Sequence, residues 1–322
     1  VRLTPKSYFT LKDIAYFVGS LHKEKTIVKH LNTRINISGK AKNEVSRLSA
    51  EGLVLQMGRT YFKGDVRMRG LPDFQSTNID AKITLLKTDI NEVKSYLPPS
   101  VKLPPELDKL GKIQFSGRYS GFPKHFVAEG TLLSDIGLVH TDVKIDIERV
   151  LRYSGKLAVK DFDVGKLLNK SEQFGKATFS AIINGKGIKS NELDIKIGSV
   201  IESFTFNNYA YTNVVIDGIV DKKLFSGNFA IADENLNLTF KGLVNFSEQT
   251  PQYQFTADLF RLNLKKLNLL KSDKLKDDFI ISGSTNLNLL GKDIDDIAGN
   301  ALFYNVKIQN GARLFALDTV KL

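Results

Sequence analysis

The sequence predicts a mainly β protein, built as an elongated, twisted antiparallel sheet with a few short helices. Three observations predict this fold. Apolar and polar residues alternate with a period of two over most of the chain, short turn sequences separate the alternating runs, and a unit of one short helix plus several strands recurs four times. Because short turns join neighbouring strands as hairpins, we expect a meander of about 20 strands, roughly 4.8 Å apart.

The alternation is clearest in the second half of the chain. Four runs carry apolar side chains at most alternate positions: residues 193–197, 236–246, 255–259 and 279–289. Successive side chains of a strand point to opposite faces, so each run predicts a strand with one apolar face and one polar face. Four turns are predicted around these runs: Gly218 and residues 221–223, 233–235 and 291–292.

Each recurring helix is predicted from a capping residue that is followed by apolar residues one and four positions later. The four sets are Thr10 with Leu11 and Ile14, Asp89 with Ile90 and Val93, Asp163 with Val164 and Leu167, and Asn263 with Leu264 and Leu267. Side chains of these capping types accept hydrogen bonds from the free amides at a helix start. The caps lie 79, 74 and 100 residues apart. This spacing predicts a repetitive array with units starting near residues 10, 89, 163 and 263.

The placement of proline predicts that residues 1–322 form one continuous structure. No proline lies between Pro123 and Pro251, as expected where proline would interrupt the hydrogen-bond ladder of a central strand. A proline cluster is interpreted as a stiff connector after the second helix: Pro98, Pro99, Pro104 and Pro105. The chain starts without methionine and ends within a strand pattern, so we interpret it as an internal segment of a larger protein.

Composition predicts a folded protein without disulfides. Hydrophobic residues make up 42% and charged residues 25% of the chain, both close to the average of globular proteins. Cysteine is absent, which excludes disulfides, thiolate metal sites and cysteine nucleophiles. No stretch reaches the roughly 18 apolar residues of a membrane helix. The net charge of +11 comes without a basic run, so we expect a solvated, lysine-rich exterior and no nucleic-acid partner.

No motif predicts an enzyme, a metal site or a cofactor. The four histidines lack zinc-type spacing and are interpreted as surface residues: His22, His30, His125 and His140. Residues 233–234 and 293–296 are acidic but lack the ligand spacing of a calcium loop, so they are interpreted as solvated turns. Residues 185–189 lack the order of a phosphate loop and are interpreted as a hairpin turn. Tyr209 and Tyr211 are expected in cross-strand packing or at a polar rim.

The predicted apolar face requires a cover, because a sheet buries its apolar face against something. The predicted helices are too few and too short to cover a sheet of this extent. Four arrangements remain open from the residues alone: a second sheet packed on the first, closure into barrels, stacked coils, or a curled sheet whose inside holds something apolar.

Four segments carry a resemblance to a known family. They are residues 10–17 (TLKDIAYF), 70–73 (GLPD), 206–213 (FNNYAYTN) with Asp217 and Gly218, and 233–242 (DENLNLTFKG). With these segments and the helix-plus-strand repeat, the chain resembles the AsmA-like family of bridge-like lipid transfer proteins over essentially its whole length. More specifically, it looks like an internal segment of a TamB protein of the Bacteroidota type.

The resemblance implies a sheet curled like a taco around an apolar groove. It implies a function in the translocation and assembly module, where phospholipids move through the periplasm between the inner and outer membranes of a Gram-negative bacterium. The implied partner is an Omp85-class, TamA-like barrel of the outer membrane, and the full-length protein is expected to be anchored in the inner membrane. The anchor and the extreme C-terminal region are not expected within this segment, so docking to the partner is not assigned to its residues.

A groove of this kind shields acyl chains from water. Burial of a CH₂ group contributes about 0.8 kcal/mol, whereas burial of a charged head group is strongly unfavourable. We therefore expect tails inside the groove and head groups in water. Thirteen residues are predicted to line the groove: Leu193, Ile195, Ile197, Phe204, Phe206, Leu236, Leu238, Phe240, Phe255, Leu259, Ile281, Leu287 and Leu289.

Three alternatives stay open. The same residues are also consistent with an ordinary core between two sheets. The chain is also consistent with a scaffold or chaperone for outer-membrane protein assembly, which would bind partner strands at a sheet edge by β-augmentation. An extracellular β-solenoid adhesin is a further alternative, although the unequal repeat spacing does not favour stacked coils of uniform length.

Overall fold

The structure is a computed structural model that describes residues 1–17, 28, 30–96, 105–187, 191–269, 278–292 and 296–321. It confirms a mainly β fold: the described residues form nineteen strands, all antiparallel in their pairings within each unit, and only a few short helices. The chain divides into two compact units. Unit 1 contains residues 1–151, unit 2 contains residues 169–322, and the residues of strand β10 (Arg152–Asp163) and helix α4 (Val164–Leu168) are divided between them.

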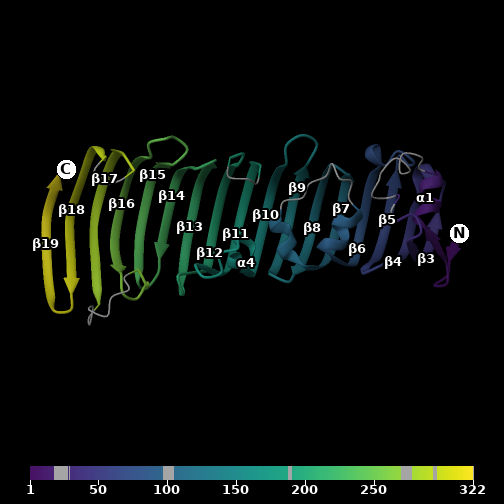
Figure 1. Ribbon diagram of the computed structural model, residues 1–322, viewed down its shortest axis with the longest axis horizontal. Coiled ribbons are helices and arrows are strands. Elements are labelled where there is room, and N and C mark those ends of the chain that lie inside the picture. Colours follow the sequence, from purple (N-terminus) through teal and green to yellow (C-terminus); the bar gives the residue numbers. More distant parts are fainter. Residues whose placement is uncertain are drawn as a thin grey trace. The chain divides into compact units, whose positions relative to one another are not determined.

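Unit 1 is an antiparallel sheet in which neighbours in sequence are neighbours in space (Figure 1). Both β1 and β2 pair with β3, and each later strand pairs with the next. The strands are β1 Arg2–Leu3, β2 Tyr8–Thr10, β3 Arg34–Lys42, β4 Ser49–Met57, β5 Thr60–Arg69, β6 Asn78–Asp89, β7 Lys112–Phe122, β8 His125–Ser134 and β9 Gly137–Asp146. Three 3₁₀ turns connect them: η2 Val45–Arg47, η3 Phe74–Ser76 and η4 Pro105–Leu110.

Unit 2 continues the same plan as an uninterrupted meander. Each strand from β11 to β19 pairs antiparallel with the next one in the sequence. The strands are β11 Phe174–Lys186, β12 Asp194–Phe206, β13 Tyr209–Asp221, β14 Leu224–Ala232, β15 Leu236–Asn245, β16 Gln252–Asn263, β17 Phe279–Leu290, β18 Ala298–Asn310 and β19 Arg313–Lys321.

Three of the four predicted helices begin directly after their predicted caps. Helix α1 (Leu11–Phe17) follows Thr10, α3 (Ile90–Tyr96) follows Asp89, and α4 follows Asp163. At α1, the carboxylate of Asp13 accepts hydrogen bonds from the Thr10 amide and hydroxyl, both at 2.8 Å. This reciprocal arrangement satisfies amides that have no partner within the helix.

The fourth predicted helix is wrong, because residues 264–268 form a single turn. Asn263 does cap this turn: its side-chain oxygen accepts from the Lys266 amide at 3.2 Å, and its carbonyl accepts from the Leu267 amide at 3.1 Å. The turn ends after one such i to i+4 bond, at Asn268, which has a left-handed φ of 57°. The predicted cap is therefore confirmed, whereas the predicted length of the helix is not.

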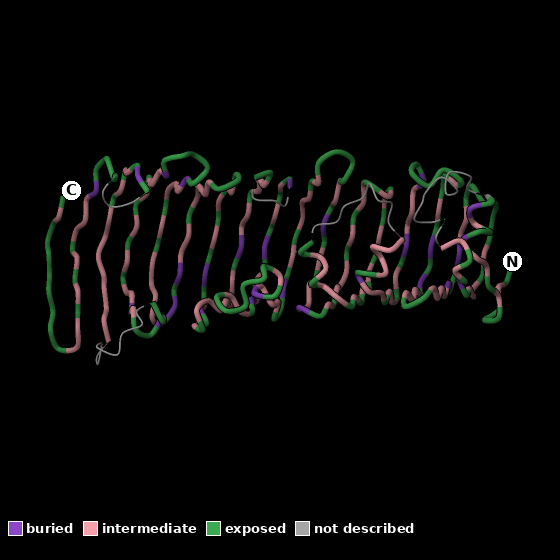
Figure 2. The backbone as a smooth tube through the Cα atoms, viewed as in Figure 1, coloured by how far each residue is buried: buried purple, intermediate pink, exposed green. Residues whose placement is uncertain are grey.

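Along most strands of both units, exposed positions alternate with half-buried ones (Figure 2). Cross-strand register places apolar residues of neighbouring strands on one face. In unit 2, one such row is Ile216, Phe229 and Phe240, and in unit 1 another is Leu55, Phe62 and Leu86. The prediction of strands with one largely apolar face is confirmed in both units.

A row of glycines crosses the apolar face of unit 2. Gly218, Gly227 and Gly242 pair in register on β13, β14 and β15. A Cβ atom on any of them would lie within 3.0 Å of a backbone carbonyl oxygen in the neighbouring strand. The strands thus approach too closely here for any side chain, as at a tight bend of a sheet. The interpretation of Gly218 as a turn is wrong, because this glycine lies inside β13.

The opposite face of unit 2 is less uniformly polar than the alternation suggests. Four apolar side chains on it are at least 46% exposed: Ile182, Val200, Val215 and Ile219. Val200 and Val215 are direct cross-strand partners on β12 and β13. Single exposed apolar residues are normal on a protein surface, and the register of the strands is unaffected.

Several interpretations made from the sequence fall outside the described residues. These concern Pro98, Pro99 and Pro104, His22, Asp293 and Asp295, and the end of the segment 185–189. Pro105, the last residue of the proline cluster, is the first residue of η4.

Candidate functional site

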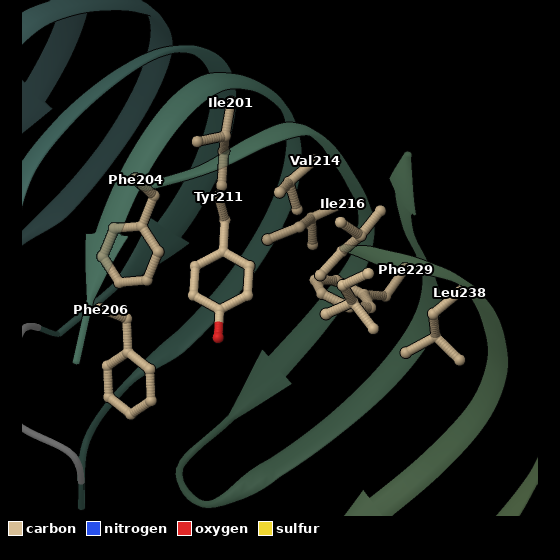
Figure 3. Close-up of a pocket in the computed structure, with 10 residues that line it drawn as sticks. Ile201, Phe204, Phe206, Tyr211, Val214, Ile216, Phe229 and Leu238 are labelled. Carbon is tan, nitrogen blue, oxygen red and sulfur yellow. The ribbon is translucent and has the colours of Figure 1, made fainter. Parts of the chain in front are cut away.

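Unit 2 contains an apolar pocket of about 530 Å³ on the inner side of its curved strands (Figure 3). The volume is in the range of sites that bind small ligands. Side chains of four consecutive strands, β12 to β15, line it: Ile201, Phe204, Phe206, Tyr211, Val214, Ile216, Phe229, Ile231, Leu236 and Leu238. Tyr211 is the one residue of this set whose side chain carries a polar atom.

A local irregularity brings these side chains to one face. In β13 the side chains of Tyr211 and Val214 both face the pocket, although regular alternation would put residues three apart on opposite faces. Asn213 lies between them with a left-handed φ of 54°, and the pairing of β12 with β13 is interrupted at this position. The register of β12 against β13 is the same on both sides of this position, so the left-handed conformation of Asn213 changes the direction of the neighbouring side chains without an inserted residue.

The structure places four of the thirteen predicted lining residues in this pocket: Phe204, Phe206, Leu236 and Leu238. Most of the others lie on the same face, further along the strands or on β16 and β17, as their register shows. Ile195 and Ile197 pair with Val220 and Gly218, and Phe255 pairs with Leu287. All thirteen are half-buried. They are neither in a closed core nor on a fully solvated face.

Six pocket residues were not predicted from the sequence: Ile201, Tyr211, Val214, Ile216, Phe229 and Ile231. The alternation of Val214 with Ile216, and of Phe229 with Ile231, was a usable signal. The left-handed conformation of Asn213 gave no such signal, since a single sequence does not show where an asparagine adopts it.

One turn from a distant part of the unit covers the pocket edge. Leu267, in the turn after β16, is fully buried in a cluster with Tyr211, Val214 and Ile231. Its neighbour Asn268 donates a side-chain hydrogen bond of 3.0 Å to the carbonyl oxygen of Asn207, in the turn between β12 and β13. This turn therefore reaches from the end of β16 back to the end of β12.

Asp233 ties the same edge together through a network of hydrogen bonds. Its carboxylate accepts from the hydroxyls of Tyr209 at 2.5 Å and Thr212 at 2.9 Å, and from the amides of Thr212 at 3.1 Å and Asn235 at 2.9 Å. Asp233 is only 7% exposed. Its interpretation as part of a solvated turn is wrong, because these donors allow the charge to be buried.

The electrostatics of this edge follow from the burial and the charge of Asp233. Burial alone would raise the pKa of Asp233, but hydrogen bonds from Tyr209, Asn235 and Thr212 outweigh it and hold the pKa below its usual value. Burial raises the pKa of Tyr209 and of Tyr211, and the negative charge of Asp233 adds to both shifts. Both tyrosines are therefore neutral and Asp233 is ionised at neutral pH.

Unit 1 has a corresponding apolar cluster on its inner face. Ala50, Leu53, Val66 and Ala81 are buried on β4, β5 and β6. Partly buried side chains surround them: Ile37, Leu55, Phe62, Met68, Ile79, Ile83 and Tyr119. None of these residues was singled out from the sequence.

The histidines that the structure describes have local partners. His125 lies 3.3 Å from Asp146 and 3.5 Å from Glu148, His140 forms a 2.9 Å hydrogen bond with Thr131, and His30 contacts the ring of Tyr96. In the described part of the chain, no three His, Asp or Glu side chains are grouped so as to hold a metal ion. Within the same residues, no helix has the length and apolarity needed to cross a membrane.

Comparisons with protein-family models, with characterised proteins and with solved structures find no match for this chain. Its class is therefore defined by the fold and the pocket: an antiparallel β meander whose inner face is apolar, partly open and, in unit 2, hollowed into a pocket.

Proposed function

We propose that the inner face of this chain binds the acyl chains of phospholipids and shields them from water during transport between two membranes. One observation carries the proposal: large apolar side chains line this face, yet all thirteen predicted lining residues are only half-buried. In a closed core, residues such as Phe255, Leu287 and Leu289 would be buried. An apolar surface left partly open over several strands is typical of a binding surface.

The energetics favour a long apolar ligand. Each buried CH₂ contributes about 0.8 kcal/mol, so an acyl chain of a dozen or more carbons gains considerably from contact with this face. A phosphate head group loses its hydration if it is buried. A face that is apolar inside and open along an edge accommodates both parts of the same molecule.

The helices are short compared with most strands of the sheet. Helices α1 and α3 have seven residues each and α4 has five. Each follows the end of a strand, and one of them spans only about 10 Å. Among the described residues, the covering element of the unit 2 pocket is the short turn around Leu267.

The wider role that we propose follows from the resemblance to the AsmA-like family. In this proposal the chain is part of a TamB-like bridge in the periplasm of a Gram-negative bacterium, anchored in the inner membrane by another part of the protein. It would deliver phospholipid toward the outer membrane together with an Omp85-class barrel protein. In this proposal the lipid is moved physically and no bond is made or broken, so the transfer requires no catalytic residue.

Native mass spectrometry with lipid extraction tests this proposal. The chain is purified in mild detergent from a Gram-negative host, as the wild type and as Leu238→Glu. We expect bound phospholipid in the wild type and its loss in Leu238→Glu, with the fold retained by circular dichroism. Folded wild-type protein without phospholipid would contradict the proposal.

A matched control is available one residue away. Asn237 lies on the opposite face of β15, directly across from Arg261. Asn237→Glu adds the same charge to the same strand, next to a positive partner and away from the pocket. This variant is expected to retain bound phospholipid, which separates an effect on the groove from an effect of net charge.

A further inference from the structure

The side chains that line the pocket of unit 2 differ in how far they are buried. Seven of them are half-buried: Ile201, Phe204, Phe206, Ile216, Phe229, Leu236 and Leu238. The other three are nearly completely buried, since Tyr211 is 8%, Val214 4% and Ile231 7% exposed. These three form a buried cluster with Leu267, which comes from the turn of residues 264–268. The turn therefore covers one part of the pocket lining and leaves the rest open.

The covered part of the lining is continuous with the open part. Val214 pairs with Ile201 on β12 and with Ile231 on β14, and Ile231 pairs with Leu238 on β15. Figure 3 shows Tyr211 and Val214 on the inner side of the curved strands, where they belong to one buried cluster. Without the turn, the covered and the open side chains would form one uninterrupted surface.

The closed position of the turn carries an unfavourable contribution at Asn263. This residue is fully buried, and its side-chain oxygen caps the turn by accepting from the Lys266 amide at 3.2 Å. Its side-chain nitrogen, however, is a buried donor without a partner among the described residues. Such a donor destabilises the arrangement that buries it. Because the turn starts at Asn263, movement of the turn away from the sheet would let water reach this nitrogen.

We propose that the turn of residues 264–268 is a displaceable cover, and that an acyl chain takes the place of Leu267 against the three buried side chains of the pocket. This inference rests on the proposed function and adds a covered subsite to the same site. A leucine side chain and an acyl chain are both hydrocarbons, so displacement exchanges one apolar contact for another. A ligand that requires the open position binds more weakly when fewer molecules are open. The stability of the closed turn therefore sets the affinity for the lipid.

Thiol labelling measures this displacement directly, because the chain contains no cysteine of its own. In Leu267→Cys the thiol is buried while the turn is closed, and it reacts with a maleimide when the turn opens. Saturating phospholipid is expected to speed this reaction about tenfold, as an open state that holds about 10% of the molecules becomes the main one. Leu269→Cys, at a position that is 42% exposed, is the control and is expected to react equally fast with and without lipid.

Two variants of the turn are expected to shift the lipid affinity in opposite directions. Asn268→Gly removes the hydrogen bond to Asn207 and retains the left-handed conformation, so an NBD-labelled phospholipid should bind about fivefold more tightly. Asn263→Ser keeps a capping oxygen and removes the unpaired donor, so the closed turn is stabilised and the same probe should bind about fivefold more weakly. A general loosening of the unit would shift both variants alike. Shifts in the same direction, or no shift in either variant, would overturn the proposed cover.

The outcomes for the two proposals are distinguishable. If phospholipid binds but leaves the labelling of Leu267→Cys unchanged or slows it, the cover is refuted and the apolar binding face stands. If the wild-type chain binds no phospholipid, the proposed function itself fails and the cover fails with it.

Discussion

In unit 1 the buried cluster of the inner face consists of Ala50, Leu53, Val66 and Ala81, all from neighbouring strands of the sheet. In unit 2 the corresponding cluster contains Tyr211, Val214 and Ile231 together with Leu267, which comes from outside the sheet. The unit 1 cluster is made mainly of small side chains that are buried by their neighbours. The unit 2 cluster is made of larger ones that border a pocket of about 530 Å³.

The two units also hold their strand ends differently. In unit 1, Glu92 of α3 accepts hydrogen bonds from the Arg59 amide at 2.9 Å and the Thr60 hydroxyl at 3.2 Å. In unit 2 the buried Asp233 performs the same task from a turn. Both units nevertheless share glycines that pair across the apolar face, Gly117 with Gly130 in unit 1 and Gly218 with Gly227 in unit 2. The bend of the sheet is therefore common to both units, whereas the space on its inner side depends on the side chains and the covering turn.

The largest expected contrast comes from placing a charge on the inner face of each unit. Leu53→Glu, at a buried position in unit 1, is expected to lower the free energy of unfolding by about 4 kcal/mol, because an unpaired charge is buried. Leu238→Glu, at a half-buried position in unit 2, is expected to cost about 1 kcal/mol. Urea unfolding followed by circular dichroism measures both. Equal losses would show that the two faces are packed alike.

Removing the covering side chain of unit 2 is expected to have the next largest effect. Leu267→Ala should lower the free energy of unfolding by about 3 kcal/mol, because a fully buried leucine leaves a cavity. Leu269→Ala is the control, since Leu269 lies just after the same turn and is 42% exposed. Calorimetry is expected to show a lower transition temperature for the first variant only. A small loss for Leu267→Ala would mean that the turn does not hold the pocket edge.

A methyl group on the glycine row tests the bend itself. Gly227→Ala is expected to cost about 2 kcal/mol, because its Cβ would overlap the backbone of β13. A Cβ atom on Gly198, in β12, would meet no other atom within 4 Å, so Gly198→Ala should leave stability within roughly 0.5 kcal/mol. Chemical denaturation of both variants gives the comparison. If both alanines are tolerated, the strands are not held as close as the row indicates.

The smallest expected effect is the acid sensitivity that Asp233 gives unit 2. Its pKa in the folded protein is below the ordinary value of 3.8, so the charged form favours folding. Its stabilising contribution is present above pH 3.8 and is lost as the pH falls through the lower pKa of the folded state. Stability measured from about pH 5 down to about pH 2 should therefore decline less steeply in Asp233→Asn. Parallel profiles for the two proteins would exclude this role.

Much of the fold follows from local patterns in the sequence. The alternation of apolar and polar residues predicted which face of the sheet each side chain occupies, because a shift of one residue would expose every apolar side chain. Three helix starts followed from Thr10, Asp89 and Asp163, since capping depends on residues that are adjacent in the chain.

The pocket was predicted less completely from the sequence. The left-handed conformation of Asn213 and the burial of Asp233 depend on contacts between residues of different strands, which alternation alone does not encode. Gly218 was misread for a related reason: glycine marks turns and also close strand contacts, and only the pairing with Gly227 distinguishes the two. Leu267 was predicted on a helix face, but its contact with Tyr211, in a strand far away in the sequence, was not foreseen.

Photo-crosslinking in a Gram-negative host tests the central claim most directly, because neighbouring residues of one strand face opposite sides. A photoreactive residue is placed at Leu238 or Thr239 in unit 2 and at Ile83 or Lys82 in unit 1. We predict phospholipid adducts at Leu238 and Ile83 and none at Thr239 and Lys82. The absence of lipid at Leu238, or equal labelling of both faces, would contradict an acyl-chain binding face.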